Sequence, residues 1–144
     1  MTTYSKPLPA PSPETQPFWD ACKVREFRAQ QCSNCGGFRW PPAGLCPQCR
    51  SWDFEWTTLP GTGTVYSYVA VHYVSVQAFA DDVPYVIANI SMDGTDGKVI
   101  FLSNVIGIPW EQVKVGMPVE VVFEDVTEEI TLPKFRPVTK EFIG

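Results

Sequence analysis

The stretch CSNCGGFRWPPAGLCPQC, residues 32–49, decides the fold of this chain. It contains two Cys-x-x-Cys pairs, Cys32 with Cys35 and Cys46 with Cys49, separated by ten residues. Each two-residue spacing lets a tight turn direct two sulfur atoms at one point, and an intervening hairpin brings the second turn opposite the first. The pattern therefore predicts a four-cysteine metal site in a small ribbon.

Four protein sulfurs complete a tetrahedral coordination sphere, so we expect a structural ion rather than one that activates water. Zinc is the favoured metal, and iron in a rubredoxin-like site is the alternative because the same ligands suit it. Gly36 and Gly37 fit the first turn, where the backbone often needs a positive φ. The nearby Arg28, Arg39 and Arg50 would offset part of the charge of a zinc–tetrathiolate centre.

Before the ribbon, the chain divides into an arm and a short helix. Residues 1–13 contain four prolines, and we expect an extended arm that gains order only by lying on another surface. Residues 16–23, QPFWDACK, predict a helix of two turns, which is too short to be stable alone in water. The helix must dock on its own domain or on a second chain, where Phe18 and Trp19 are candidate contacts. Cys22 is expected to be a packed thiol.

After the ribbon, strand-like runs alternate with turn signals. Five runs are rich in β-branched and aromatic residues, at 61–74, 84–92, 98–105, 117–126 and 132–138. Five strands in so short a segment fit an OB-type barrel, with a small sandwich as the main alternative. We therefore expect a mostly β chain: an arm and helix at 1–24, a zinc ribbon at 25–58, and a five-stranded OB-fold barrel at 59–144.

Charge is distributed unevenly along the chain, which has a formal net charge of −5. Residues 22–50 hold five Lys or Arg against one Glu and so carry +4, whereas residues 51–144 carry −8. No lysine or arginine occurs between Gly61 and Met92. A nucleic-acid binder needs a basic face that neutralises phosphates. The acidic barrel therefore argues against nucleic acid as the ligand.

The sequence contains no evident catalytic constellation. The single histidine, His72, has no accompanying Ser, Cys or Asp pattern and is expected at the barrel surface or rim. Glu124-Asp125 and Glu128-Glu129 flank a turn and are expected to form a solvated edge. There is no glycine-rich phosphate loop and no dinucleotide fingerprint. We therefore do not expect this chain to be an enzyme by itself.

Aromatic side chains gather in the ribbon and at the entrance of the barrel. They are Phe38, Trp40, Trp52, Phe54, Trp56, Tyr66, Tyr68 and Tyr73. Most are expected to pack the seam between ribbon and barrel, because a thin ribbon needs large side chains for burial. The alternative is a partner surface centred on Arg39 and Trp40, beside two prolines. The two interpretations divide the residues between them.

The start of the chain, MTTYSKPLPAPSPE, has no apolar run, and no stretch of 18 uninterrupted apolar residues occurs. We therefore expect a cytoplasmic protein without a secretory signal or a membrane span. In that compartment, cysteines are expected to be thiols or metal ligands rather than disulfides.

With these motifs in view, the chain resembles the zinc-ribbon OB-fold family long classified as domain of unknown function number thirty-five. The resemblance covers nearly the whole chain, through PFWDACK, EFRAQQCSNCGGFRWPP, CPQCRSWDFEW, GTGTVYSYVAVH, VPYVIANI, VGMPVEVVFEDV and LPKFRPV. It implies an N-terminal helical arm, a rubredoxin-like zinc ribbon with all four cysteine positions filled, and a C-terminal OB barrel.

The resemblance also implies a working context. Members are partners of thiolase-like enzymes that act on acyl-CoA esters, including lipid-transfer-type homologues that cleave steroid side-chain CoA esters by retro-aldol chemistry, acyltransferases and condensing enzymes. The thiolase-like chain carries the catalytic residues, while the ribbon and barrel subunit stabilises it and helps form the passage for the CoA ester. We therefore expect a non-catalytic accessory subunit in a hetero-oligomer.

The alternative function is a stand-alone OB-fold module that binds single-stranded nucleic acid or acyl-CoA. Exposed aromatic residues and a basic groove on residues 62–92 would favour nucleic acid. If the isolated chain binds acyl-CoA, Arg39 or Arg50 is the expected phosphate contact.

Overall fold

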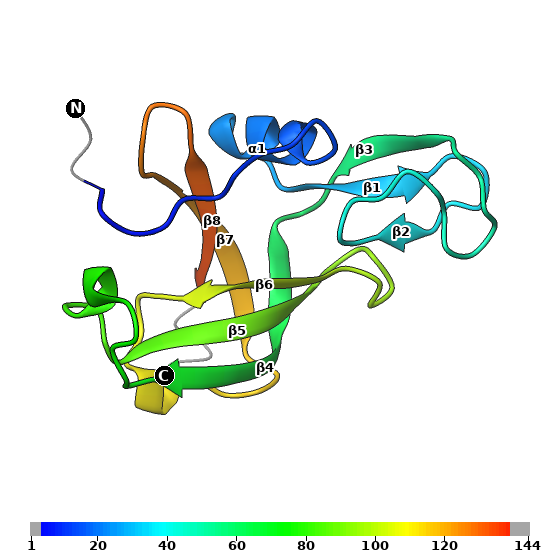
Figure 1. Ribbon diagram of the computed structural model, residues 1–144. Coiled ribbons are helices and arrows are strands. Elements are labelled where there is room, and N and C mark those ends of the chain that lie inside the picture. The colour runs from blue at the N-terminus through cyan, green and yellow to red at the C-terminus, as the bar shows by residue number, and fades with distance from the viewer. Residues whose placement is uncertain (1–3, 139–144) are drawn as a thin grey trace.

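The computed structural model describes residues 4–138 (Figure 1). In chain order the elements are α1 (Gln16–Lys23), β1 (Arg28–Cys32), β2 (Phe38–Arg39), β3 (Phe54–Thr58), β4 (Thr62–Val71), the 3₁₀ turn η1 (Gln77–Phe79), β5 (Tyr85–Met92), β6 (Ile100–Val105), the 3₁₀ turn η2 (Trp110–Gln112), β7 (Pro118–Asp125) and β8 (Thr131–Pro137). They form a small sheet at one end of the molecule and a barrel at the other.

The ribbon is a three-stranded antiparallel sheet with β1 in the centre. Gln30 of β1 pairs with Arg39 of β2 on one side and with Trp56 of β3 on the other. The barrel is closed, with strand order β4-β5-β6-β8-β7. The predicted five-stranded OB barrel behind a zinc-ribbon sheet is therefore confirmed, and the sandwich alternative is excluded.

Closure of the barrel depends on a tightly curved β4. Its residues 62–64 pair with β7 and its residues 63–71 pair with β5, with a shift in the β5 register between Val65 and Ser67. At Gly63 an added Cβ would lie 2.4 Å from the carbonyl oxygen of Ser91, so a side chain does not fit. Glycine lets β4 and β5 approach closely at the point where the sheet bends.

Helix α1, the ribbon and the barrel share one aromatic core. The buried ring of Phe18 on α1 lies 5.4 Å from Phe27, 4.8 Å from Trp40 of the ribbon and 5.6 Å from Phe101 of β6. In Figure 1, α1 lies over the junction between the two sheets. The two-turn helix is thus stabilised by packing on its own chain. Because this core crosses the predicted boundaries at residues 24 and 58, the division into three units stays a prediction.

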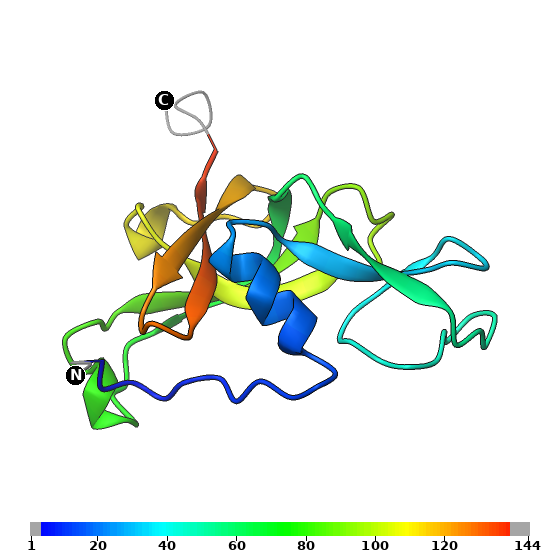
Figure 2. The ribbon, with the colours of Figure 1, turned by 90° about the horizontal axis from the view of Figure 1, so that it is seen from above.

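The proline-rich arm runs from α1 across the molecule to the far end of the barrel (Figure 2). Its Lys6 forms an ion pair with Asp82, in the loop between β4 and β5, and lies 5.5 Å from the ring of Phe79. The arm therefore has the supporting surface that its composition requires, and its own barrel provides that surface.

Strand β4 is shorter than predicted. The expected run reached residue 74, but β4 ends at Val71, which is the last residue paired with β5, opposite Tyr85. His72 therefore lies just beyond the strand rather than within it, because no partner strand continues. It is exposed, and its ring stands edge-on to Trp110 at 4.9 Å. This location agrees with the expected place at the rim.

Candidate metal centre and binding surfaces

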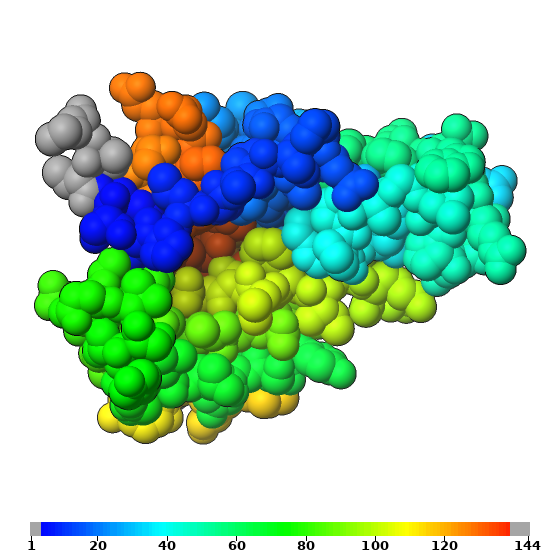
Figure 3. All heavy atoms as spheres, viewed as in Figure 1, coloured from blue at the N-terminus to red at the C-terminus, as the bar shows by residue number. Residues whose placement is uncertain are grey.

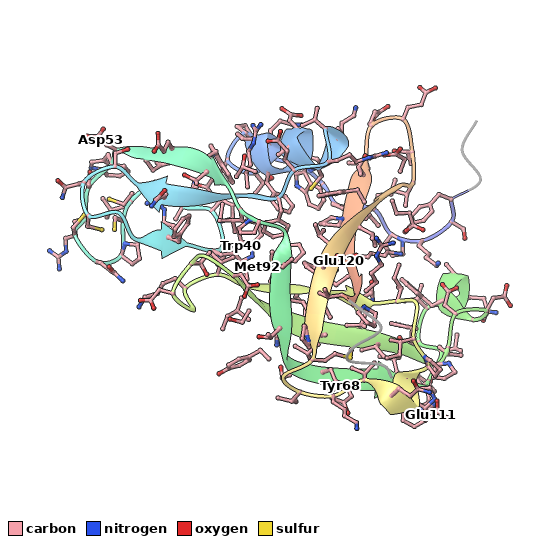
Figure 4. The ribbon with its side chains drawn as sticks, turned by 180° about the vertical axis from the view of Figure 1, so that it is seen from behind. Trp40, Asp53, Tyr68, Met92, Glu111 and Glu120 are labelled. Carbon is pink, nitrogen blue, oxygen red and sulfur yellow. The ribbon has the colours of Figure 1, made fainter. Side chains whose placement is uncertain are left out.

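The four cysteines converge at the end of the ribbon distant from the barrel. Their sulfur atoms all lie within 4.8 Å of one another. Cys32 Sγ lies 3.5 Å from Cys49 Sγ, and Cys35 Sγ lies 3.7 Å from Cys46 Sγ. A tetrahedral zinc ion with bonds of about 2.3 Å places its sulfur ligands about 3.8 Å apart. The sulfur geometry therefore fits zinc, and Figure 4 shows the sulfur atoms near the labelled Asp53.

The two Cys-x-x-Cys turns have the same backbone hydrogen bonds. In the first, Gly36 N–H donates to Cys32 O and Cys32 N–H donates to Gly37 O, both at 2.9 Å. In the second, Arg50 N–H donates to Cys46 O and Cys46 N–H to Ser51 O, again at 2.9 Å. Both turns thus present their sulfur pairs in the same way, so the ribbon forms the site from two copies of one motif.

Equivalent positions in the two turns adopt a left-handed backbone. Gly36 has a φ of +78°, as the sequence predicted, and Arg50 has a φ of +63°. Gly37 instead has an ordinary φ, and an added Cβ there would lie 3.2 Å from the Gln48 side chain. Arg50 therefore accepts a conformation that usually costs a non-glycine residue about 1–2 kcal/mol.

Local hydrogen bonds favour the thiolate form of three of the ligands, Cys32, Cys46 and Cys49. At Cys35 the Gly37 N–H acts in the same direction, but the adjacent sulfur atoms, that of Cys46 above all, raise the pKa of the thiol to about 11. The backbone N–H of Cys35 lowers the pKa of the Cys32 thiol, and the backbone N–H of Cys49 lowers the pKa of Cys46. In contrast, burial raises the pKa of Cys22 to about 12. Cys22 is fully buried on α1, which confirms it as a packed thiol. The four ribbon cysteines are suited to bind metal, whereas Cys22 is not suited to react.

A buried arginine lies in the same small sheet. The Arg39 side chain is 5% exposed, and its Nε donates to Gln30 Oε1 at 2.8 Å while Nη2 donates to Ala43 O at 2.7 Å. Its guanidinium also lies 4.7 Å from the Phe54 ring, and Nη1 has no partner among the described residues. None of these contacts is a carboxylate. A zinc ion with four thiolates, net charge −2, would supply the negative charge that this cation lacks.

The glutamine in this network was not singled out from the sequence. Gln30 is 1% exposed, and its side-chain oxygen also accepts the Ala43 N–H at 2.8 Å. It therefore ties β1 to the loop that follows Arg39. The sequence shows only that Gln30 lies between Ala29 and Cys32, beside a second glutamine. Without the fold, that position is weak evidence for a buried polar side chain.

The proposed contact residues do not form one surface. Phe18 and Arg39 are buried within the chain, Trp19 and Trp40 are partly buried against the core, and Arg50 is exposed at the metal site. The labelled Trp40 and Met92 lie together at the junction in Figure 4. A role for these five in ligand or partner contact stays a prediction, because their observed contacts are within this chain.

The exposed aromatic and apolar groups lie elsewhere, mainly on the barrel. Tyr66 and Val69 of β4 are 61% and 58% exposed, and Leu102 of β6 is 61% exposed. Strands β4, β5 and β6 contain no Asp, Glu, Lys or Arg, whereas β7 and β8 contain five such residues. We call the outer face of β4, β5 and β6 the uncharged wall. The aromatic residues thus divide between the seam, with Trp40 and Trp56, and the exposed surface.

Across residues 4–138, no helix is both long and apolar enough to cross a membrane. In the same part of the chain, the four cysteines are the one group of three or more potential metal ligands whose ligand atoms meet. A catalytic metal site is therefore not found among the described residues.

Comparison with known families matches both parts of the chain. Residues 19–55 match "ChsH2, rubredoxin-like zinc ribbon domain", and residues 56–124 match "ChsH2, C-terminal OB-fold domain". The ribbon match and the sulfur geometry together assign the site to structural zinc, as expected, in preference to iron.

Individual similar proteins point to the same family. The chain is 33% identical to a chain of a solved structure entitled "Ltp2-ChsH2(DUF35) aldolase", with a TM-score of 0.82, over 92% of this chain and 100% of that one. It is 37% identical to a "DUF35 domain-containing scaffold protein" of Methanocaldococcus jannaschii, over 75% of this chain and 79% of that protein.

A longer relative shows the same segment within a larger protein. The chain is 35% identical to a "Probable enoyl-CoA hydratase alpha subunit" of Thermomonospora curvata over 94% of its own length, but it spans 41% of that subunit. These matches extend from α1 through the ribbon to the barrel. The chain therefore belongs to the DUF35 family of zinc-ribbon OB-fold proteins.

Proposed function

We propose that this chain is a non-catalytic accessory subunit of a thiolase-like enzyme that acts on acyl-CoA esters. The observation that carries the proposal is the full-length match to a chain from the Ltp2-ChsH2(DUF35) aldolase structure. The likeness to a scaffold protein and to part of a hydratase subunit supports the same role. The partner provides the catalytic residues, and this subunit stabilises it and helps form the passage for the CoA ester.

The chemistry of the described residues supports a non-catalytic role. Four cysteine ligands leave zinc no position for substrate or water. His72 contacts Trp110 at the rim, and the Cys22 thiol is buried and strongly protonated. Neither residue has a neighbouring base or nucleophile that would define a covalent mechanism. We therefore propose that the catalytic groups belong to the partner.

The uncharged wall supports a protein partner. The core of a protein–protein interface is depleted in charged residues and enriched in aromatic ones. The wall has both properties, with Tyr66, Val69 and Leu102 exposed and no charged residue on its three strands. We expect the partner to cover this face in the assembled enzyme.

The nucleic-acid alternative is not favoured, because the strands that would form an OB-type binding face carry no lysine or arginine. Binding of the acyl-CoA ester by this chain is a finer proposal. Residues 22–50 hold five Lys or Arg against one Glu, but Arg25 and Arg28 are in ion pairs and Arg39 is buried. Lys23 and Arg50 are therefore the cations of this segment best suited to attract CoA phosphates. A steroid side-chain ester as substrate rests on the family resemblance alone.

Co-purification from the native host tests the proposal. Tagged protein should recover a thiolase-like chain in stoichiometric ratio, together with one equivalent of zinc. Recovery of nucleic acid, or of the tagged chain alone, would contradict the accessory role.

Charge insertion locates the interface. Val69→Asp and Leu102→Asp should each abolish co-purification, because an uncompensated carboxylate would be buried in the interface. Val115→Asp is the matched control, since Val115 is 66% exposed but lies outside the wall. If all three variants recover the partner equally, another face is the interface.

A further inference from the structure

A second candidate site lies at the open end of the barrel, far from the metal centre. A cavity of about 730 Å³ occupies this mouth, a size typical of small-molecule sites. Its lining combines apolar and aromatic side chains with charged and polar ones. The first group includes Leu8, Tyr85, Val105, Ile106, Ile108 and Trp110, and the second consists of Lys6, Asp82, Asn104, Glu124 and Lys134. Figure 3 shows the surface hollowed between the blue arm and the yellow-green strands. The barrel mouth is thus a concave site in which apolar and aromatic residues outnumber charged ones.

The arm forms one wall of this cavity, and its Lys6 joins it to the loop between β4 and β5. Lys6 forms an ion pair with Asp82 and lies 5.9 Å and 5.5 Å from the rings of Tyr4 and Phe79. Pro7, Leu8 and Pro9 then line the cavity. We call the Lys6–Asp82 pair and the Phe79 ring the latch. Release of the latch would free the wall without disturbing a barrel strand.

The charges around the mouth restrict what can enter. Four carboxylates lie there, those of Asp81, Asp82, Glu124 and Asp125. Three cations face them: Lys6 pairs with Asp82, Lys134 pairs with Glu124 at 2.7 Å, and Arg25 pairs with Asp125 at 2.7 Å. The charged residues that line the cavity itself, Lys6 and Lys134 against Asp82 and Glu124, sum to zero, and Asp81, Asp125 and Arg25 around it add −1. The three cations are already paired. Such a rim disfavours a phosphate-bearing molecule such as CoA.

We infer that the barrel mouth binds an uncharged apolar molecule and that the arm, closed by the Lys6 latch, is its lid. The apolar and aromatic residues of the lining bury the body of such a molecule. The three cations named above are all in ion pairs, so none of these described residues offers an anionic head a free partner. This site does not depend on the accessory role, because every residue that forms it belongs to this chain. It also separates apolar ligands at the barrel from CoA phosphates, for which the basic ribbon is the suited part.

Binding of Nile red, a neutral apolar dye, tests the cavity in the full zinc-loaded chain. The dye should bind at one equivalent and change the fluorescence of Trp110. Ile106→Asp and Leu8→Asp should each weaken binding by about tenfold or more, because a carboxylate would face the apolar body. Leu8 lies on the arm, so its substitution leaves the barrel strands intact. Val115→Asp is the matched control and should bind normally, because Val115 is exposed and lies outside both the cavity and the uncharged wall.

The lid is tested by the rate of dye association. Lys6→Met and Asp82→Asn remove either half of the latch and should each accelerate association about two- to fivefold, as expected for one exposed ion pair with a cation–π contact. The double variant should be no faster than either single variant, because both changes break the same latch.

Several outcomes would overturn the inference. Absence of saturable dye binding, or equal weakening by Val115→Asp, would remove the cavity as a site. Binding of the anionic dye anilinonaphthalene sulfonate as tightly as Nile red would refute the exclusion of anions. Unchanged association rates in both latch variants would refute the lid.

Discussion

The ribbon and the barrel obtain their stability by different means. Along β5 of the barrel, every second residue is buried and apolar: Val86, Ala88, Ile90 and Met92. In the ribbon, Phe27 and Ala29 belong to the apolar core, but the other buried positions hold Gln30, Arg39 and two of the metal-binding cysteines. The barrel is stabilised by apolar burial, whereas the ribbon requires an ion. Removal of the metal should therefore affect the ribbon, and truncation of the barrel core should affect the barrel. The exception is the aromatic core around Phe18, which the two regions share.

The largest effect is expected from loss of the metal. Cys46→Ser should release zinc and unfold the ribbon, because structural zinc contributes an apparent binding free energy of about 10–16 kcal/mol in small domains. Hydrogen exchange should become fast in β1 and β3 while β5 stays protected. Cys22→Ala is the control and should retain one equivalent of zinc. Retention of zinc and a normal melting curve in the Cys46 variant would refute a structural site.

The aromatic core shared by α1, the ribbon and the barrel should couple the unfolding of the two regions. Phe18→Ala should lower the free energy of unfolding by about 3–5 kcal/mol, because a buried ring shared by helix, ribbon and barrel is lost. Urea unfolding followed by separate ribbon and barrel signals should then show two transitions. The control is Trp52→Ala, since Trp52 is 73% exposed and its loss should change stability by less than about 0.5 kcal/mol. A single unshifted transition would show that the seam does not couple them.

Arg39 tests whether the ribbon depends on charge as well as on coordination. Arg39→Met should weaken zinc binding in a chelator competition, because the buried cation no longer balances the thiolates. Arg39→Lys keeps the charge but loses the paired hydrogen bonds to Gln30 and Ala43. It should retain zinc affinity yet lower stability by about 1–3 kcal/mol. Equal zinc affinity in all three proteins would limit Arg39 to a packing role.

Local signals predicted much of this structure. Cysteine spacing located the ribbon, helix periodicity placed α1 at Gln16–Lys23, and β-branched runs located the five barrel strands. What failed depends on contacts between distant residues. The end of β4 is set by its pairing with Tyr85, and the network of Gln30 and Arg39 exists only when β1 and β2 align. The path of the arm likewise depends on Asp82, far along the chain from Lys6.

The smallest effect concerns the two equivalent turns within the ribbon. Arg50 and Gly36 occupy equivalent positions, and both have a positive φ. An added Cβ at Gly36 would meet nothing within 4 Å, so backbone conformation rather than space decides whether glycine is preferred there. Arg50→Gly should raise stability by up to about 1 kcal/mol, since relief of the left-handed strain exceeds the added entropy of the unfolded chain. Gly36→Ala should lower stability by about 1–2 kcal/mol. Arg50→Ala removes the same charge without relieving φ, so thermal melting of zinc-loaded Arg50→Ala and Arg50→Gly separates the two causes. If both variants melt together, the charge of Arg50 rather than its backbone distinguishes the turns.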